Sequence, residues 1–327
     1  MAGENRDKGN VTDRGMTEAI LIKEIAGRRD MKNKFRFRVV SLMLCAAVFL
    51  GACKSTDSEE KSASGESRIY ETEDGTYYTF QDAEGKSYDA PLLDNVPRCS
   101  YNFEYLKTDE ETGFKSYEDK EKGVVARLGI DVSEFQGEEI DWEQVKDSGI
   151  EFVIVRLGYR AYGENGELVL DAMFERNVEG ALDAGLQVGV YFFSQAISGA
   201  EAVEEAEFVL KHLDSYDIDG PVICDTEEIR FDTARTDENT PQEFTNYCKV
   251  FCDTVEHAGY DSMIYSNMKW MAYSLDMEEL TEYDFWYADY HDTPQCPYDY
   301  KIWQYTESGT VPGINTNVDL NLWFQEE

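Results

Sequence analysis

The sequence predicts an α/β fold: an irregular (β/α) barrel that follows a small β-rich N-terminal appendage. Three observations support this prediction. Short apolar runs of strand length recur from Arg127 onward. Stretches with helical periodicity separate the earlier runs, which is typical of a parallel sheet covered on both faces. The runs number about eight in roughly 200 residues, which is the number of strands that closes a barrel.

The composition excludes several classes of protein. Among 327 residues, 67 Asp and Glu stand against 30 Lys and Arg, so the net charge is −37 and binding to anionic nucleic acid is disfavoured. Only three histidines occur and the seven cysteines lack C-x-x-C spacing, so we expect neither a zinc site nor a haem. Five cysteines follow residue 53, an odd number, and we expect them to be buried free thiols.

Residues 31–53 have the pattern of an export signal. Met31 opens a basic segment, and the 14 residues from Val39 to Ala52 are uncharged, too short to span a bilayer but typical of a signal peptide. The run ends in Leu50-Gly-Ala-Cys53, which resembles the lipobox of bacterial lipoproteins. This resemblance implies that Cys53 carries a lipid anchor. The alternative is an ordinary secretory signal in which the cysteine is incidental.

Three further segments flank this signal and precede the barrel. Residues 1–30 do not fit a signal peptide, so we expect a misassigned start codon or, alternatively, a cytoplasmic extension. Residues 54–68 are rich in Ser and Glu and predict a flexible polar linker. Residues 69–126 form the β-rich appendage, in which the segments 76–80 and 86–88 flank a turn and predict a hairpin.

The barrel domain is predicted over residues 127–327. Its strands are expected at Leu128–Val132, Phe152–Gly158, Val188–Ser194, Val222–Asp225, Ser262–Ser266, Phe285–Ala288, Ile302–Tyr305 and Val318–Leu322. Helices are expected near 141–148, 171–184, 199–213 and 241–258. The last three strands are too close together for full helices between them, so we expect irregularity there. An open doubly wound sheet is the alternative, although no GxGxxG or P-loop motif supports a nucleotide-binding version.

Polar residues collect at the carboxyl ends of the predicted strands, where α/β barrels carry their active sites. Asp225 and Glu227 are separated by one residue, so in an extended segment both point to the same side. Two carboxylates this close disfavour double ionisation, and we expect the pKa of Glu227 to rise. Such a pair suits glycoside hydrolysis, which needs a proton donor and an anion. The alternative is a solvated acidic turn.

Aromatic residues lie on or near the same strand ends. Flat rings with a polar edge suit the faces of sugars. The alternative for part of this set is packing in the core. The candidates for substrate binding are Tyr191, Phe193, Tyr265, Trp303 and Tyr305.

Taken in order along residues 127–324, these motifs resemble glycoside hydrolase family 25, the lysozymes (N-acetylmuramidases) of the Chalaropsis type. The resemblance implies an irregular barrel similar to a TIM barrel. It also implies cleavage of the β-1,4 bond between N-acetylmuramic acid and N-acetylglucosamine in peptidoglycan. The matching segments are Leu128–Gly137, Ile140–Trp142, Phe174–Asn177, Gly189–Tyr191, Pro221–Glu227, Ala258–Tyr260, Ile264–Asn267, Trp303–Tyr305 and Val318–Asn321.

The resemblance also implies roles for individual residues. Glu227 matches the general acid, and Asp225 matches the paired carboxylate that assists attack by the substrate's own 2-acetamido group. Asp131 and Asp319 match further carboxylates that bind or position substrate, and no metal or cofactor is implied. Phe193 departs from the family, whose members often carry a polar aromatic residue there.

We therefore expect a muramidase of the bacterial cell envelope. Its expected partners are peptidoglycan glycan strands and, through the lipid anchor, the extracellular face of the cytoplasmic membrane; secretion without an anchor is the alternative location. Nucleic acid is not an expected partner. Two other functions stay open: a non-catalytic glycan-binding module of the same fold, and a glycosidase acting on another amino-sugar polymer.

Overall fold

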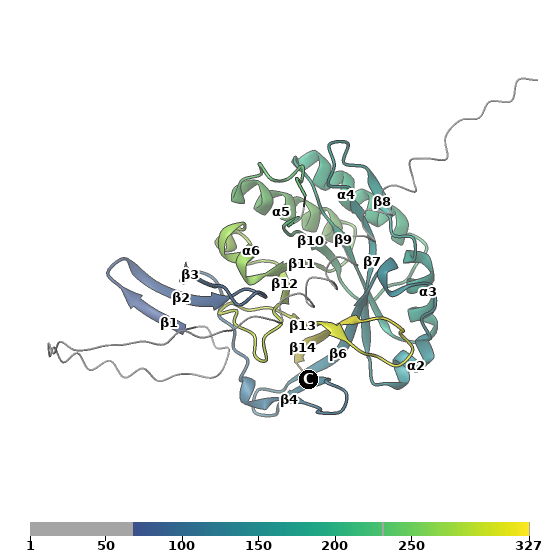
Figure 1. Cartoon of the computed structure of the whole chain (residues 1–327). Helices are drawn as coiled ribbons and strands as arrows, with labels where there is room; N and C mark the ends of the chain where they lie inside the picture. The colour runs from purple at the N-terminus through teal and green to yellow at the C-terminus, as the bar shows by residue number, and fades with distance from the viewer. Residues whose placement is uncertain (1–67, 231, 327) are drawn as a thin grey trace, which may run out of the picture. The chain divides into compact units, whose positions relative to one another are not determined.

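The computed structural model describes residues 68–230 and 232–326, which belong to one compact unit (Figure 1). The predicted extension 1–30, the signal peptide 31–53 with Cys53, and the linker up to residue 67 lie outside the described residues. Within the described ranges, no helix combines the length and the apolar character needed to cross a membrane.

A three-stranded antiparallel sheet opens the described chain. Its strands are β1 (Arg68–Thr72), β2 (Gly75–Gln81) and β3 (Ser87–Pro91), paired in the order β1-β2-β3. In the turn between β2 and β3, the Asp82 carboxylate accepts hydrogen bonds from the backbone N–H groups of Glu84 and Lys86, at 3.1 and 2.8 Å. This sheet confirms the predicted hairpin and adds β1 to it.

The charged segment that follows is weakly patterned in the sequence, yet it forms further elements. They are η1 (Phe103–Tyr105), β4 (Leu106–Thr108) and β5 (Lys115–Asp119). β4 pairs with β5, and β5 pairs with the start of β6. Backbone hydrogen bonds therefore join this part of the appendage to the barrel sheet.

Eight strands close into a barrel, which confirms the predicted fold class (Figure 1). They run in the circular order β6-β14-β13-β12-β11-β10-β9-β7, and the pairing of β6 with β7 closes the circle. The short strand β8 (Leu168–Leu170) pairs with the end of β7 outside the circle. The barrel strands are β6 (Val124–Val132), β7 (Phe152–Arg160), β9 (Gln187–Phe193), β10 (Val222–Asp225), β11 (Ser262–Asn267), β12 (Asp284–Ala288), β13 (Ile302–Gly309) and β14 (Val318–Glu326).

The last strand runs against the other seven. Neighbours from β6 through β13 pair in parallel, whereas β14 is antiparallel to both β13 and β6. The prediction of a wholly parallel sheet is therefore wrong for β14. The connection 310–317 is too short for the crossover that a parallel neighbour would need. As a result, the start of β14 lies beside the carboxyl ends of the other strands.

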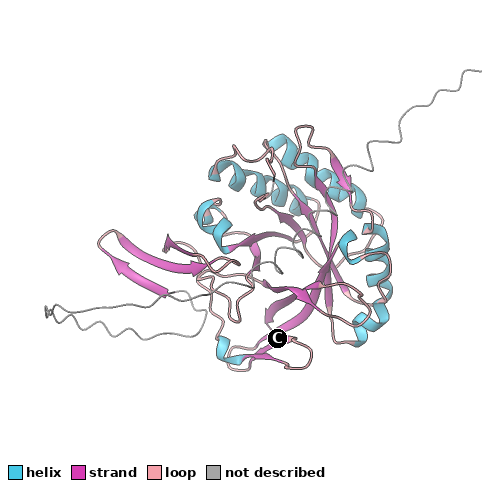
Figure 2. Ribbon diagram, in the orientation of Figure 1, coloured by secondary structure: helices cyan, strands magenta, loops and turns pink. Residues whose placement is uncertain are grey.

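Helices cover the outside of the barrel (Figure 2). Four of them fall where helices are predicted: α2 (Trp142–Asp147), α3 (Phe174–Asp183), α4 (Gly199–Leu213) and α5 (Pro241–His257). α5 begins with a capping box between Thr240 and Glu243, and Pro241 suits the first helical position. The elements α6 (Met268–Tyr273), η2 (Glu134–Gln136) and η3 (Met277–Glu279) are not among those predicted.

Alternation along the strands separates two apolar cores. Outward side chains such as Val153 and Val190 belong to the larger core, which also contains the buried helix residues. Gly129 lies on the inward face, where a Cβ atom would come within 2.3 Å of the Phe152 ring, so the position requires glycine. Inward side chains form a smaller core of Phe152, Ile154, Ile223, Met263, Tyr265, Trp286, Ala288 and Ile302.

The cysteines of the described residues are free thiols. Cys224, Cys248, Cys252 and Cys296 are buried, whereas Cys99 is partly exposed. The expectation of buried free thiols is thus confirmed for all but Cys99.

Candidate active site

Three aspartates lie on the inward face of the barrel at one end. Asp225 ends β10, and Asp131 is the last but one residue of β6. Asp319, near the start of β14, is directly opposite Asp131 in the antiparallel pair. Asp131 and Asp225 are each only 5% exposed. The reversal of β14 therefore brings Asp319 to the end where the other two aspartates lie.

Two side-chain amides support Asp131. Gln304 Nε2 and Asn321 Nδ2 donate hydrogen bonds to Asp131 Oδ2, at 2.9 and 2.8 Å. Trp286 Nε1 donates to Asn321 Oδ1 at 2.8 Å, which fixes the orientation of that amide. Burial raises the pKa of Asp131, while the hydrogen bonds from the two amides favour its charged form.

Gln304 connects this carboxylate to two tyrosines. Its Oε1 atom accepts hydrogen bonds from Tyr265 Oη at 3.0 Å and from Tyr290 Oη at 2.9 Å. Tyr265 lies on β11, and Tyr290 follows β12. Side chains from five neighbouring strands or their ends, β6, β14, β13, β12 and β11, are thereby joined in one hydrogen-bonded network.

Asp131 and Asp319 share a hydrogen bond, and the pKa values of both carboxyl groups are raised. Burial raises the pKa of Asp319 to about 9, and the charge of Asp131 and its hydrogen bond with Asp319 act in the same direction. Asp319 therefore stays protonated at neutral pH and donates to Asp131.

Asp225 and Glu227 form the second acidic pair. Burial raises the pKa of Asp225 well above its ordinary range, the charges of Glu227 and Asp131 raise it further, and the Arg156 guanidinium lowers it. Desolvation raises the pKa of Glu227 to about 7. The expected direction for Glu227 is confirmed, but its main cause is desolvation, and the repulsion within the pair acts on Asp225.

The arrangement can perform acid catalysis in water near neutral pH. Glu227 holds a transferable proton up to about pH 7. Asp225 Oδ1 is buried and has no hydrogen-bond partner among the described residues. An acceptor left open in this way is available to a donor group of a ligand.

Three of the predicted aromatic residues lie on the inward face. The ring centroids of Tyr191 and Tyr265 are 5.8 and 4.6 Å from that of Trp286. Phe193, the last residue of β9, is partly exposed and lies in register with Asp225. These three residues therefore lie on the same inward face as the three aspartates.

Trp303 and Tyr305 lie on the opposite face of β13, so the prediction that they bind substrate is corrected. Both are buried in the larger core. Trp303 Nε1 donates to the backbone oxygen of Asp289 at 2.8 Å, and Tyr305 Oη accepts from the backbone N–H of Lys115 at 3.2 Å. Between them in the sequence, Gln304 occupies the inward position.

Sequence reasoning missed five residues of the site: Arg156, Trp286, Tyr290, Gln304 and Asn321. Gln304 and Asn321 lie in motifs that were singled out for other residues. Gln304 is next to Trp303, and Asn321 is two residues after Asp319. Strict alternation with the apolar inward positions would have placed both inside the barrel. Tyr290 follows the end of its strand, where alternation gives no signal.

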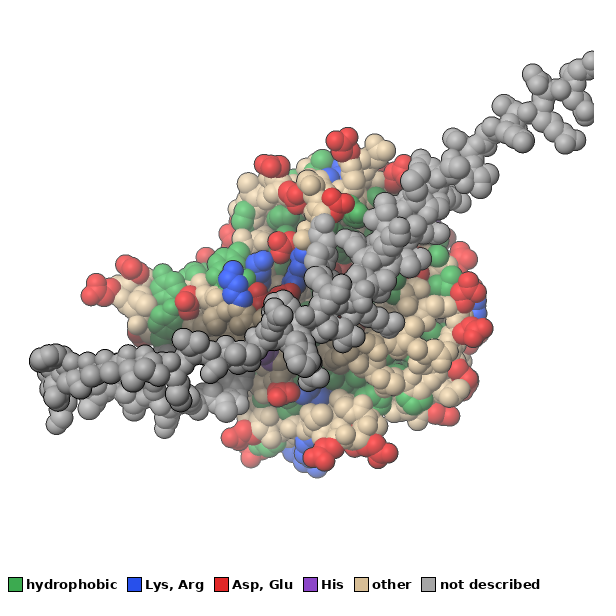
Figure 3. All heavy atoms as spheres, in the orientation of Figure 1, with side chains coloured by type: hydrophobic (Ala, Val, Ile, Leu, Met, Phe, Trp, Pro, Cys, Tyr) green, Lys and Arg blue, Asp and Glu red, His purple; other side chains and the backbone are tan. Residues whose placement is uncertain are grey.

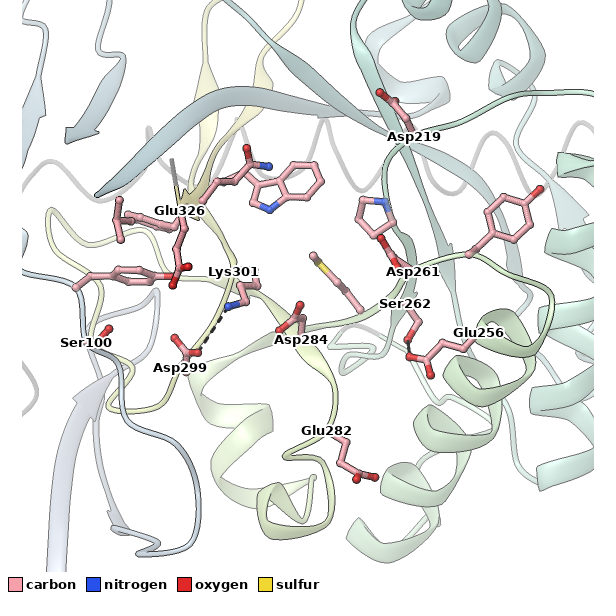
Figure 4. A pocket seen from close by; sticks show the side chains of 18 of the residues that line it. Ser100, Asp219, Glu256, Asp261, Ser262, Glu282, Asp284, Asp299, Lys301 and Glu326 are labelled. Carbon is pink, nitrogen blue, oxygen red and sulfur yellow. Dashed lines mark hydrogen bonds and ion pairs between the residues drawn. The ribbon is translucent and has the colours of Figure 1, made fainter. Parts of the chain in front are cut away.

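A cavity of about 860 Å³ lies at the other end of the barrel and contains none of the predicted site residues (Figure 4). Its lining is acidic, with Asp261, Asp284 and Asp299 near the starts of the strands and Lys301 4.0 Å from Asp299. Within residues 68–230 and 232–326, no group of His, Cys, Asp or Glu is arranged to hold a metal ion.

A family comparison decides what this barrel is. The sequence matches the family described as glycosyl hydrolases family 25 over residues 130–314, more than half of the chain. The chain belongs to glycosyl hydrolases family 25. This glycosyl hydrolase is therefore an enzyme of the predicted class. The matched range contains Asp131, Asp225 and Glu227 and ends before Asp319.

Two relatives are similar to this glycosyl hydrolase over much of its length. The uncharacterized protein YegX of Escherichia coli K12 is 28% identical over 245 residues, which are 69% of this chain and 84% of that protein. An autolytic lysozyme of Clostridium acetobutylicum is 25% identical over 194 residues, which are 59% of this chain and 54% of that protein. The glycosyl hydrolase thus spans about half the length of the lysozyme.

Solved structures share the fold of this glycosyl hydrolase. The autolysin LytC of Streptococcus pneumoniae has a TM-score of 0.54 at 22% identity, covering 80% of this chain and 58% of that one. The spore cortex lytic enzyme SleM of Clostridium perfringens has a TM-score of 0.52 at 22% identity, covering 61% of this chain and 67% of that one. At this identity the likeness shows the fold alone.

Proposed function

We propose that this glycosyl hydrolase is a muramidase that cleaves the β-1,4 bond between N-acetylmuramic acid and N-acetylglucosamine in peptidoglycan. The observation that carries the proposal is the pair Asp225 and Glu227 at the end of β10, in which Glu227 keeps its proton up to about pH 7. The relatives support the substrate: one is an autolytic lysozyme, and LytC was solved in complex with a synthetic peptidoglycan ligand.

In the proposed reaction, Glu227 acts first as acid and then as base. It donates its proton to the glycosidic oxygen as the bond from that oxygen to C1 breaks. The 2-acetamido oxygen of the substrate bonds to C1 and forms a cyclic oxazolinium ion. Water then adds to C1, the bond from the acetamido oxygen breaks, and Glu227 takes up the proton. Two displacements at C1 retain its configuration.

Asp225 orients the acetamido group in this scheme. Its Oδ1 atom lacks a hydrogen-bond partner among the described residues and is the acceptor for the acetamido N–H. Its negative charge stabilises the positive oxazolinium ion. Asp131 and Asp319 accept hydrogen bonds from sugar hydroxyls, and Tyr191, Phe193 and Tyr265 contact the sugar rings.

We also propose that the enzyme acts outside the cytoplasmic membrane, held there by lipid on Cys53. The lipobox-like segment supports this location, and Cys53 lies outside the described residues. With a net charge of −37, the chain is repelled by anionic surfaces, so attachment depends on the lipid. Secretion without an anchor is the alternative.

Digestion of purified peptidoglycan tests the proposed reaction. We expect soluble fragments that carry N-acetylmuramic acid at the new reducing ends, identified by mass spectrometry after borohydride reduction. Reducing ends of N-acetylglucosamine would contradict the proposed bond. Binding without release of fragments would identify a non-catalytic glycan-binding module. Cleavage of chitin with peptidoglycan left intact would identify a glycosidase for another amino-sugar polymer.

A further inference from the structure

The three-stranded sheet β1–β3 precedes the part of the chain that matches the family. The match covers residues 130–314, so membership of the family gives no role to residues 68–91. One face of the sheet is nevertheless built into the enzyme. Tyr78, Phe80 and Ala90 are each 1% exposed and belong to the larger core. Burial of these side chains fixes the sheet on the barrel domain.

The sheet is attached near the end of the barrel where the active site lies. The backbone N–H of Gln81, at the end of β2, donates to Gln295 Oε1 at 2.9 Å, and Gln295 Nε2 donates to the Gln81 carbonyl at 3.0 Å. The N–H of Gln295 in turn donates to Asp289, the residue after β12, at 2.8 Å. Tyr273 Oη donates to the Asp89 carbonyl of β3 at 2.9 Å, and Tyr273 ends α6, which directly follows β11. Both attachments are therefore to segments that leave the carboxyl ends of barrel strands.

The turn between β2 and β3, residues 82–86, reaches the loop that carries Glu227. Arg230 Nη1 donates to Glu84 Oε1 at 2.7 Å, and Arg230 is only three residues after Glu227. The side chains of Arg230 and Glu84 are 42% and 63% exposed, so both keep surface that another molecule can contact. Lys86 is also exposed, with Nζ 4.8 Å from the centroid of the Tyr88 ring. The turn thus brings exposed hydrogen-bonding groups beside the catalytic loop.

Hydrogen bonds fix the conformation of this turn. Asp82 Oδ1 accepts the backbone N–H groups of Glu84 and Lys86, and Asp82 Oδ2 accepts from Tyr88 Oη at 2.9 Å. Gly85 has a φ of +79°, a conformation that favours glycine. A turn ordered in advance loses little conformational entropy when it binds a ligand. The other turn of the sheet, between β1 and β2, points away from the barrel (Figure 1).

We infer that the turn of residues 82–86 is part of the substrate-binding surface and contacts sugars of the glycan strand beyond those joined by the cleaved bond. The inference rests on the proposed function, because it takes the glycan strand as substrate and places the cut at Glu227. Sugar hydroxyl groups donate and accept hydrogen bonds, which suits Glu84 as an acceptor and Lys86 as a donor. The turn takes no part in bond cleavage.

The test compares the double variant Glu84→Ala/Lys86→Ala with wild type on two substrates. One substrate is glycan strands freed of their peptides by an amidase, and the other is the shortest fragment of these strands that the wild type cleaves. For the strands, KM should rise about 2- to 10-fold for each hydrogen bond lost, with kcat unchanged. For the short fragment, neither constant should change. A KM that stays the same for the strands, or rises equally for both substrates, would overturn the inference.

The matched control lies in the other turn of the same sheet. Glu73→Ala/Asp74→Ala also removes two exposed charged side chains, from the turn that points away from the barrel, and should leave KM unchanged for both substrates. A rise in KM equal to that of the test variant would contradict a specific role for residues 82–86. Both variants should keep the thermal midpoint of wild type, because the backbone donors that bind Asp82 remain.

A second readout needs no substitution in the turn and no hydrolysis. The Glu227→Gln protein is acetylated at its lysines with and without saturating glycan strands, and modified sites are measured by mass spectrometry. The strands should slow the reaction of Lys86 but not that of Lys120, which is 79% exposed in the turn before β6. If bound strands leave the reaction of Lys86 unchanged, the inference is wrong even where the wild type cleaves peptidoglycan. If the protein neither binds nor cleaves the strands, the proposed function fails and the inference fails with it.

Discussion

The role of Glu227 as the proton donor can be tested by substitution, with a neighbouring glutamate as the control. Glu227→Gln keeps the shape of the side chain but cannot donate a proton, so we expect kcat to fall about 10²- to 10⁴-fold with the thermal midpoint unchanged. Glu228→Gln is the matched control, because Glu228 is exposed and pairs with Lys269, at 3.0 Å, on the surface. If the Glu227→Gln variant keeps more than about a tenth of the wild-type rate, Glu227 is not the general acid.

The pH dependence of the rate follows from the same residue. The pKa of Glu227 is raised to about 7, so the side chain carries its proton below that pH and loses it above. The rate should therefore fall as the pH rises through about 7. On the acidic side, the raised pKa of Asp225 places the limb above the ordinary Asp value of about 3.9. A profile measured at saturating substrate checks both limbs, and an optimum well above neutrality would contradict the assignment.

At the scale of elements, β13 offers a test of which face lines the site. Trp303→Phe should lower the free energy of unfolding by about 1–3 kcal/mol, because the indole N–H bond to Asp289 is lost in the core. Its KM and kcat should change little. Gln304→Ala should instead lower kcat by about tenfold or more, because Asp131 loses a charge-assisted hydrogen bond. Chemical denaturation and kinetics of the two variants distinguish the faces.

A second element-scale test concerns the buried pair that joins α4 to the end of β7. Arg160 Nε lies 2.7 Å from Glu205, which is fully buried, and Arg160 Nη2 lies 2.8 Å from Glu204, which is largely exposed. Glu205→Ala removes the buried partner of the guanidinium and should cost about 3–5 kcal/mol. Glu204→Ala, on the same partner, should cost less than about 1 kcal/mol.

The stability loss expected for Glu205→Ala depends on the pH of the measurement. Burial raises the pKa of Glu205 to about 7. The pKa of Glu205 is higher in the folded protein than in the unfolded chain, where it is about 4.3. This difference adds to the free energy of unfolding, in full below about pH 4.3, and the addition is lost as the pH rises through about 7. Urea denaturation of both variants is therefore carried out at pH 8, where Glu205 of the wild type is charged. Equal losses for Glu204 and Glu205 would contradict the buried ion pair.

The alternation of side chains explains how much of the structure the sequence could predict. Each predicted barrel strand is present, because buried parallel strands form apolar runs that are easily recognised. The direction of β14 does not follow from its apolar run, which reads alike for a parallel and an antiparallel strand. The short connection before it, residues 310–317, is the signal that favours an antiparallel neighbour. Trp303 and Tyr305 were misplaced because aromatic residues suit a sugar site and a core equally well. The placement of Asp225 and Glu227 together at a strand end was predictable, because two acids one residue apart on an extended segment point to the same side.

At the scale of the whole molecule, acidic side chains are spread over the face seen in Figure 3, with basic ones among them. The chain has a net charge of −37, so repulsion disfavours attachment to anionic envelope polymers. Cys53→Ala should therefore release the protein from membrane fractions or block processing of its signal peptide. Fractionation of cells that express each form, with a blot for the protein, measures this. A variant that stays with the membranes unchanged would exclude the lipid as the anchor.

The antiparallel strand β14 also sets the order in which the molecule can assemble. Asp131 accepts a hydrogen bond from Asn321, which is 190 residues further along the chain. Contacts between distant segments form late in folding, because the entropy of a long loop opposes them. A nascent chain that stops before residue 318 lacks both the strand that closes the barrel and Asp319. Ribosome-bound or truncated chains of this kind should therefore be inactive, and lytic activity should arise only after β14 has been synthesised.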